Sequence, residues 1–524
     1  MARILIPEKL GERGLDLLRD AGHDVDVQLD LSPDELASAM ATADALIIRS
    51  ATQVTAELLA AAPSLKVIGR AGVGLDNIDT DAATANGVIV ANAPTSNSVS
   101  AAEHTMAMLL AVARNVPQAH AALVDGRWER SAWGGTELLD KTLGIIGLGN
   151  IGGIVATRAK AFGMRLIGHD PFVTDERASE LDVELVSLDE LIAGSDFLTL
   201  HIARTPETVN LINAERLATA KPNLRVINVA RGGIVNEVDL AAAIEAGTVA
   251  GAAIDVFDSE PKTDSPLFGL PQVVVTPHLG ASTAEAQDRA GVTIAEQVRL
   301  ALDGDFVPFA VNVAARGVPD FVRPFLPLAE QLGAQFGRLV GENPTAIEMV
   351  FAGEIGGMDC RMAELAVTKG LIAELTDASV SYVNAETLAG ELGIKIEARG
   401  TTKTPSGLVN GIKITGDGHS IAGTIDVGTG DRRVISVDDI TIDLPLSEHL
   451  LVVINDDTPG MIGQVGTIFG NAAINIDDMH VARSLVSSEA LLAIATSVPL
   501  PESVLAEIAN VPSVLSAKEI GVRG

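Results

Sequence analysis

Cysteine, basic residues and long apolar runs are all scarce in this chain of 524 residues. Its single cysteine, Cys360, excludes an internal disulfide framework and a cysteine-based zinc cluster, so we expect no metal. No apolar run approaches the roughly 18 residues that cross a bilayer. The first residues, MARILIPEKL, lack the basic segment, apolar run and cleavage site of a secretory signal. We therefore expect a cytoplasmic protein without a membrane partner.

The charge balance is strongly acidic, with 37 lysines and arginines against 69 aspartates and glutamates, a net charge of −32. This balance argues against a nucleic-acid partner, and a solubilising acidic surface is its plainest interpretation. An anionic substrate would then need a locally basic pocket, so arginines near a candidate site are informative. The length and the 47% of apolar residues predict roughly three or four folded domains.

The segment Lys141–Asp170 predicts a dinucleotide-binding unit, in which a strand at 142–146 runs into the turn GLGNIG and a helix at 153–162. The glycines of G-x-G-x-x-G permit a tight turn, let backbone approach a pyrophosphate, and let helix pack on strand. The helix N-terminus favours the phosphates. A second strand at 165–168 leads to Asp170, where a carboxylate binds ribose hydroxyls and favours NAD over NADP. The contacts predicted from this motif are Gly147, Gly149, Gly152 and Asp170.

Strands and helices alternate on both sides of this unit, which predicts parallel, doubly wound sheets with ligands at the carboxyl ends of the strands. Ser98–Arg114 is expected to be a helix buried between domains or subunits, and His104 within it is interpreted as a packed interface histidine rather than a catalytic one. A helix at 284–302 should return the chain to the first domain. The expected strands are 3–7, 24–28, 45–49, 66–70 and 88–92, then 197–201, 225–229, 251–256 and 273–276.

The C-terminal part changes in pattern at a proline-rich stretch. Pro319, Pro324 and Pro327 predict a linker that leads to a helix at 328–340, followed to about 445 by short strands with one or two helices. Residues 449–524 follow the order strand, helix, strand, strand, helix, strand, which predicts a ferredoxin-like unit. The predicted domains are a first domain at 1–98 and 283–317, a nucleotide-binding domain at 99–282, an intervening α+β domain at 318–447 and a ferredoxin-like domain at 448–524.

Three residues that can perform chemistry follow later predicted strands. Arg231, in NVARGG, presents a planar fork suited to a carboxylate. His278, in TPHLGAS, can accept a hydroxyl proton during hydride transfer, and the carboxylate of Glu260 can stabilise the resulting imidazolium. Singly, these residues are also compatible with a surface cation, a buried histidine and a charge at a helix N-terminus. Their joint position at strand ends after one cofactor motif favours a dehydrogenase site.

At these motifs the chain resembles the D-isomer-specific 2-hydroxyacid dehydrogenases. GLGNIG with its downstream Asp, NVARGG, SEP and PHLGAST carry the resemblance, which covers about residues 1–317. It implies an α/β fold in which a Rossmann-like nucleotide domain is inserted in a flavodoxin-like substrate domain. It also implies His278 as general acid and base, Glu260 as its partner, and Arg231 as the carboxylate and carbonyl clamp. The further NAD contacts that it implies are Asn150, Ile151, Val229, Ala230, Asp255, Gly280 and Ala281.

Within this family, RSAT, GRAGVGLDNID and PTSNSVSAAEHT look most like the members that oxidise 3-phospho-D-glycerate to 3-phosphohydroxypyruvate, the entry step of serine biosynthesis. Arg49 and Arg70 match the phosphate side, and Arg130 matches a position that reaches a neighbouring subunit's cleft. A dehydrogenase for another D-2-hydroxy acid, such as 2-hydroxyglutarate or glycerate, is an alternative, as is a catalytically silent regulator that binds NAD or an amino acid. The implied substrate contacts are Arg49, Ser50, Arg70, Val73, Gly74, Asn97 and Arg130.

The C-terminal unit resembles an ACT domain, the amino-acid-sensing module of biosynthetic enzymes. Asp457, Gly460 and Asn475 match its effector-binding loop and the strand start that faces it, which implies L-serine as a feedback effector. A purely structural dimerisation unit is the alternative. Residues 318–447 look like the extra domain of the longer family members, where an anionic ligand is an expected occupant. The resemblance also implies a symmetric homo-oligomer, with a tetramer expected.

Overall fold

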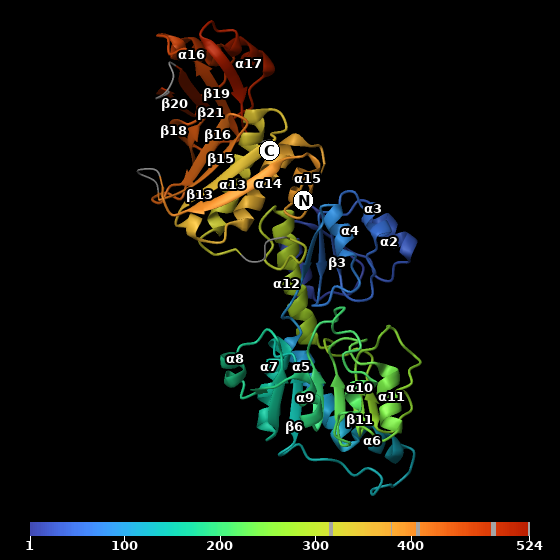
Figure 1. Ribbon diagram of the computed structural model, residues 1–524. Coiled ribbons are helices and arrows are strands. Elements are labelled where there is room, and N and C mark those ends of the chain that lie inside the picture. Colours follow the sequence, from blue (N-terminus) through green and yellow to red (C-terminus); the bar gives the residue numbers. More distant parts are fainter. Residues whose placement is uncertain (314–317, 379, 405–408, 484–488, 522–524) are drawn as a thin grey trace.

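The computed structural model describes residues 1–313, 318–378, 380–404, 409–483 and 489–521. The boundary predicted at residue 317 lies outside these described residues. Figure 1 shows an elongated molecule with four β-sheets, in which the first sheet lies between the second sheet at one end and the third and fourth sheets at the other. The α/β class and the two parallel sheets predicted for the N-terminal part are confirmed.

The first sheet has the order β2-β1-β3-β4-β5 and is parallel throughout. Most of its strands are apolar and buried, and each ends one residue earlier than expected or begins one later. The helix between β2 and β3 is capped by Ser32, whose side chain forms a capping box with Glu35. The elements are β1 (Arg3–Ile6), α1 (Glu12–Asp20), β2 (Asp24–Val27), α2 (Pro33–Met40), β3 (Ala45–Ile48), α3 (Ala56–Ala60), β4 (Val67–Arg70), α4 (Thr80–Ala85) and β5 (Ile89–Asn92).

The second sheet is also parallel, with the order β12-β11-β10-β9-β6-β7-β8. The chain enters it through α5 (Ser98–Arg114) and returns through α12 (Ala284–Leu302), which packs on α1 and β4 of the first sheet. Both helices match their predicted bounds. The other elements are α6 (Val116–Val124), β6 (Thr142–Ile146), α7 (Asn150–Ala161), β7 (Arg165–His169), α8 (Asp175–Glu180), β8 (Glu184–Leu185), α9 (Leu188–Gly194), β9 (Phe197–Leu200), α10 (Ala214–Leu217), β10 (Arg225–Asn228), α11 (Glu237–Glu245), β11 (Gly251–Ile254) and β12 (Val273–Val275).

The third sheet has the order β14-β13-β15-β16-β17-β18 and is mixed, since β13 and β14 are parallel and the other pairs antiparallel. The prediction that Pro324 and Pro327 lie in a linker is wrong. Both stand in first helical turns, where a missing N–H costs no hydrogen bond. The elements are η1 (Arg323–Phe325), α13 (Leu326–Val340), β13 (Ala346–Gly353), η2 (Ile355–Gly357), α14 (Arg361–Leu375), α15 (Ala385–Glu391), β14 (Lys395–Thr401), β15 (Asn410–Gly416), β16 (His419–Ile425), β17 (Arg432–Val437) and β18 (Ile440–Pro445).

The fourth sheet is antiparallel with the order β20-β21-β19-β22, which confirms the predicted ferredoxin-like topology. One face packs on its own two helices. The other face, including Leu450 and Leu491, belongs to the same hydrophobic core as α13, α14 and the third sheet. The last two units therefore share a core. The elements are β19 (His449–Asn455), α16 (Met461–Asn471), β20 (Asp478–Arg483), β21 (Ala490–Thr496), α17 (Glu502–Ala509) and β22 (Val514–Glu519).

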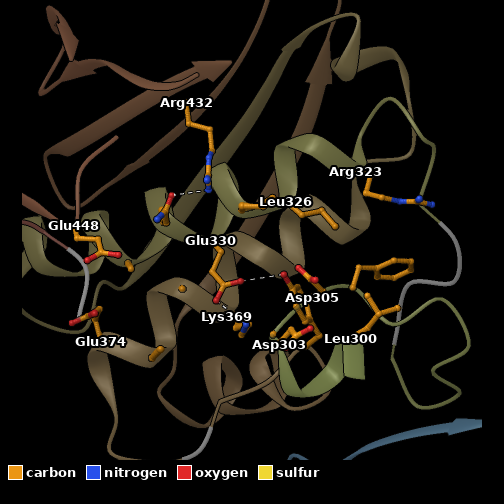
Figure 2. A pocket seen from close by; sticks show the side chains of 18 of the residues that line it. Leu300, Asp303, Asp305, Arg323, Leu326, Glu330, Lys369, Glu374, Arg432 and Glu448 are labelled. Atoms are coloured by element: carbon orange, nitrogen blue, oxygen red, sulfur yellow. Dashed lines mark hydrogen bonds and ion pairs between the residues drawn. The ribbon is translucent and has the colours of Figure 1, made fainter. Parts of the chain in front are cut away.

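A cavity of about 720 Å³ lies where the C-terminal end of α12 meets α13 and α14. Glu330 on α13 pairs with Lys369 on α14 at 2.7 Å (Figure 2). It also accepts a hydrogen bond from the Tyr382 hydroxyl at 3.1 Å. These contacts all lie within the third-sheet unit, on the wall that α13 and α14 form. No helix in the described part of the chain is long and apolar enough to cross a membrane.

Candidate active site

His278 and Glu260 form the central pair of the candidate site, on the loops that follow β12 and β11. The Nδ1 atom of His278 lies 2.6 Å from Glu260 Oε2, and both side chains are partly exposed. The backbone of His278 has a φ of 55°, a left-handed conformation that is uncommon for a residue with a side chain. Its N–H donates to the carbonyl oxygen of Asp255 at 2.8 Å, which fixes the loop at this unusual residue.

The electrostatics of the pair suit proton transfer. Partial burial acts to raise the pKa of Glu260, but hydrogen bonds from His278 and from the Phe257 N–H outweigh it, so this pKa lies below its ordinary value. Glu260 is therefore ionised wherever a histidine titrates. A fixed carboxylate on Nδ1 directs Nε2, the other ring nitrogen, toward a reacting group.

Arg231 joins this pair from the neighbouring strand end, after β10. A Cβ atom at Gly232 would overlap the carbonyl oxygen of Phe257, so the loop of Arg231 lies directly against the loop of Glu260. The Arg231 side chain reaches the first sheet, where its Nε lies 3.4 Å from Asp76 Oδ2. A Cβ at Gly74 would overlap its Nη2. Arg231 therefore lies between the two parallel-sheet units.

Arg70 provides a second cation on the first-sheet side. Burial lowers its pKa to about 10, and the nearby charges of Arg231 and Arg49 act in the same direction, yet the guanidinium remains charged at neutral pH. Among the described residues, the buried Arg70 Nε and Asn97 Oδ1 have no hydrogen-bond partner. Buried polar atoms usually have a partner. Three arginines, one of which has an unused N–H group, thus make this cleft suitable for an anion.

Arg49 lies on a loop that is held in place by Glu8, a residue that was not predicted from the sequence. The carboxylate of Glu8 accepts the backbone N–H groups of Arg49, Ala51 and Thr52 at 2.9 to 3.2 Å. Asn77 supports the same loop by donating to the carbonyl oxygens of Arg49 and Thr52. Glu8 follows the first strand, so the rule that ligands lie at strand ends could have singled it out. Ser50, Val73 and Gly74 lie on these same strand-end loops.

Arg130 is the one predicted substrate residue that the structure separates from this cleft. It is exposed in the segment between α6 and β6. Figure 1 shows this segment at the end of the second sheet that faces away from the first sheet. Within one copy of the chain, Arg130 therefore lies away from Arg49 and Arg70.

The glycine-rich turn between β6 and α7 has the predicted geometry. Gly147 has a φ of 90°, and a Cβ at Gly152 would overlap its carbonyl oxygen. A Cβ at Gly149 would meet nothing within 4 Å, so this residue presents open backbone. The helix α7 begins at Asn150, three residues earlier than predicted, which puts Asn150 and Ile151 in its first turn.

Asp170 and Asp255 occupy different environments at this edge of the sheet. Asp170 is partly exposed and accepts the Leu148 N–H of the glycine turn at 2.8 Å, which places its carboxylate at the turn. Asp255 is fully buried, and its carboxylate accepts hydrogen bonds from Thr276, Leu279 and Gly280 at 2.6 to 2.9 Å. The predicted contacts Val229, Ala230, Gly280 and Ala281 lie on the strand-end loops around Asp255.

The predicted effector residues are brought together only in part. Asp457 and Gly460 line a cavity of about 440 Å³ at the start of α16, whereas Asn475 is not among its lining residues and donates instead to Asp477. Arg483, which the sequence analysis missed, lies on the cavity wall and pairs with Asp457 at 2.6 Å. No sequence motif marked Arg483, because its pairing depends on the packing of β20.

Three family models match the chain. They are the NAD-binding domain of D-isomer specific 2-hydroxyacid dehydrogenases at residues 106–280, the D-3-phosphoglycerate dehydrogenase intervening domain at 321–438, and the ACT domain at 449–513. Among solved structures, an NAD-dependent formate dehydrogenase from Staphylococcus aureus in complex with NAD is 31% identical, with a TM-score of 0.54 over 60% of this chain and 100% of that chain. The TT0316 protein from Thermus thermophilus is 36% identical, with a TM-score of 0.55 over 59% and 99%.

Full-length relatives extend this similarity to the whole chain. D-3-phosphoglycerate dehydrogenase from Mycobacterium tuberculosis is 44% identical over 97% of this chain and 96% of its own length. The corresponding enzyme from Bacillus subtilis is 38% identical over 99% of both chains. Together with the glycine turn, the His278–Glu260 pair and the four sheets, this similarity shows that the chain belongs to the D-3-phosphoglycerate dehydrogenases, NAD-dependent enzymes of the D-isomer specific 2-hydroxyacid dehydrogenase family.

Proposed function

We propose that His278, Glu260 and Arg231 carry out the oxidation of 3-phospho-D-glycerate to 3-phosphohydroxypyruvate. His278 accepts the proton of the substrate's 2-hydroxyl group on Nε2 as the hydride leaves the same carbon. Glu260 stabilises the imidazolium, and Arg231 holds the substrate carboxylate. The observation that carries the proposal is the 2.6 Å contact between His278 and the ionised Glu260.

Bound NAD supplies the hydride acceptor. The chain offers it the open backbone at Gly149, the N-terminal N–H groups of α7 and the carboxylate of Asp170. We assign the remaining predicted NAD contacts to the strand-end loops around Asp255. Because the Asp255 carboxylate already accepts several protein hydrogen bonds, its side chain organises the loop after β12 in addition to any cofactor contact.

We further propose that Arg49 and Arg70 bind the substrate phosphate. A phosphate group can bind two cations on one side of the cleft. Glycerate has no phosphate, so it has no group there for these arginines to bind. Arg49→Ala should raise KM for 3-phosphohydroxypyruvate on the order of 10-fold, as expected for one lost charge-assisted hydrogen bond. KM for the unphosphorylated analogue hydroxypyruvate should change little. An equal effect on both substrates would contradict the phosphate assignment.

The C-terminal unit is proposed to sense L-serine at Asp457 and Gly460, with Arg483 beside them. An amino acid carries both an ammonium and a carboxylate group, and the Asp457–Arg483 pair offers a partner for each. The first experiment is NADH oxidation with 3-phosphohydroxypyruvate, with and without millimolar L-serine. Turnover that serine suppresses supports both assignments. Turnover that serine does not change would leave the C-terminal unit with a role in assembly alone. An absence of turnover would contradict the assignment of the substrate.

Self-association is the remaining part of the proposal, with a homotetramer expected. Exposed apolar side chains gather on and after α6, where Val124 is 72% and Trp128 is 82% exposed. Arg130 follows them, so a second copy seated there would bring this arginine toward a cleft that its own chain does not reach. Light scattering on the purified protein tests the assembly, and Trp128→Ser should shift it toward smaller species. The half-buried, unpaired thiol of Cys360 is consistent with the cytoplasm as the proposed compartment.

A further inference from the structure

The helix α5 holds both ends of the loop that carries His278. The Nε2 atom of His104 lies 3.1 Å from Thr276 Oγ1, at the start of the loop. One helical turn earlier, Ser100 Oγ lies 2.7 Å from Thr283 Oγ1, at its end. Residues four apart share one helix face, so a single face of α5 contacts both ends of the catalytic loop.

His104 also contacts Asp255, the buried acid whose carboxylate accepts hydrogen bonds from the loop. Its Nε2 lies 3.2 Å from Asp255 Oδ1, and its side chain is only 20% exposed. Because the Thr276 hydroxyl donates to the same carboxylate oxygen at 2.6 Å, the available tautomer of His104 is the one whose Nε2–H donates to both. Burial acts to raise the pKa of Asp255, and these hydrogen bonds outweigh it, so its pKa lies below the ordinary value.

This support bears on His278 because of its backbone conformation. A left-handed residue with a side chain persists only where its surroundings impose it. At His278 these include the backbone bond to the Asp255 carbonyl, and the next residues, Leu279 and Gly280, donate to the Asp255 carboxylate. Asp255 thus fixes the loop through both its backbone carbonyl and its carboxylate. His104, which lies outside the loop, is within hydrogen-bonding distance of both Asp255 and Thr276.

We propose that His104 is a positioning residue for catalysis. Its hydrogen bonds to Thr276 and Asp255 hold the loop in the conformation in which His278 meets Glu260 and the substrate. Since α5 follows directly on Asn97, a predicted substrate contact, it joins this residue to the helix face that holds the catalytic loop. The inference deepens the proposed function and rests on the assignment of His278 as the base. The sequence by itself indicates only a packed interface histidine at this position.

The test compares His104→Leu, which removes the donor, with His104→Gln, whose amide can replace it. Misplacing a catalytic group by about 1 Å costs roughly 10²-fold in rate. We therefore expect His104→Leu to lower kcat by about 10- to 100-fold, while KM for 3-phosphohydroxypyruvate and the Kd of NADH stay within about twofold. His104→Gln should recover most of the loss. Glu103→Gln is the matched control, because Glu103 pairs with Arg158 of α7 rather than with the loop.

Two results would overturn the inference. One is a kcat for His104→Leu close to that of the wild type. The other is an equal loss in both His104 variants, together with a lower Tm and weaker NADH binding, which would indicate a merely structural role. His278→Ala, assayed in parallel, separates this inference from the proposed function. Full turnover in His278→Ala overturns both, whereas an inactive His278→Ala beside a normal His104→Leu overturns the positioning role alone.

Discussion

At the scale of single residues, the charge of Glu260 is the first feature that can be tested. Glu260→Gln keeps the shape of the side chain and removes the anion beside His278. We expect kcat to fall on the order of 10²-fold. The acidic limb of the kcat/KM profile for 3-phospho-D-glycerate should move to lower pH, because a protonated His278 loses its stabilising partner. A limb that stays in place would contradict the role of Glu260.

The same carboxylate has a consequence for stability. The pKa of Glu260 in the folded chain lies below its ordinary value of 4.5. Glu260 therefore contributes stability that is present above this value and is lost as the pH falls through the folded pKa. Urea unfolding of wild type and Glu260→Gln at about pH 7 and pH 4 measures this contribution. The difference between the two proteins should be smaller at the lower pH.

Asp170 allows a test of cofactor choice. Asp170→Asn preserves an acceptor oxygen for the Leu148 N–H, so the glycine turn should remain intact. The negative charge that repels the 2′-phosphate of NADP is removed. We expect kcat/KM with NADPH to rise about 10-fold relative to that with NADH, which steady-state assays with each cofactor measure. An unchanged ratio would show that another group selects the cofactor.

Sequence reasoning was most successful for residues that lie at strand ends. Arg231, Glu260 and His278 were placed there by their motifs, and the structure brings their loops into contact. The role of Glu8 and the hydrogen bonds of His104 were not predicted from the sequence. The residues that they hold are 41 or more positions away for Glu8 and 151 and 172 positions away for His104, and no local pattern encodes such contacts.

At the scale of elements, two glycines of the turn before α7 allow cofactor binding and folding to be tested separately. Gly149 has room for a methyl group and a φ of −66°, so Gly149→Ala should leave Tm nearly unchanged. The added carbon would stand where a pyrophosphate approaches, so the Kd of NADH should rise on the order of 10-fold. In Gly152→Ala the methyl group meets the Gly147 carbonyl, so Tm should fall. Thermal unfolding and NADH fluorescence measure both variants, and a stable Gly152→Ala would contradict the packing.

The bounds of elements were predicted to within about two residues where apolar periodicity was strong, as in α12. The predicted bounds were wrong where a glycine or a proline is compatible with more than one start of a helix. The start of α7 lies within its glycine motif, and a proline is equally compatible with a linker and with a first helical turn, as Pro327 illustrates. Pairing of the strands in the third sheet could not be predicted, because short alternating strands specify a face but not a neighbour.

At the scale of the whole molecule, the last two units behave as one body because they share a core. Leu491 and Leu492 are adjacent on β21 and both are buried, yet they face opposite sides of the fourth sheet. Leu491 packs in the core shared with α13 and α14, whereas Leu492 packs against α16 and α17. This pair of leucines distinguishes the attachment of the C-terminal unit from its internal stability.

Replacing either leucine by alanine should cost about 2–5 kcal/mol, since both leave a cavity in a packed core. The two losses should appear in different places. Leu491→Ala weakens the junction, so limited proteolysis should release residues 448–524 as an intact fragment, and inhibition by serine should diminish while catalysis persists. Leu492→Ala weakens the fourth sheet itself, so the same protease should degrade that unit instead. Identical fragment patterns in the two variants would show that the shared core does not join the units, and the route from effector cavity to active site would have to run elsewhere.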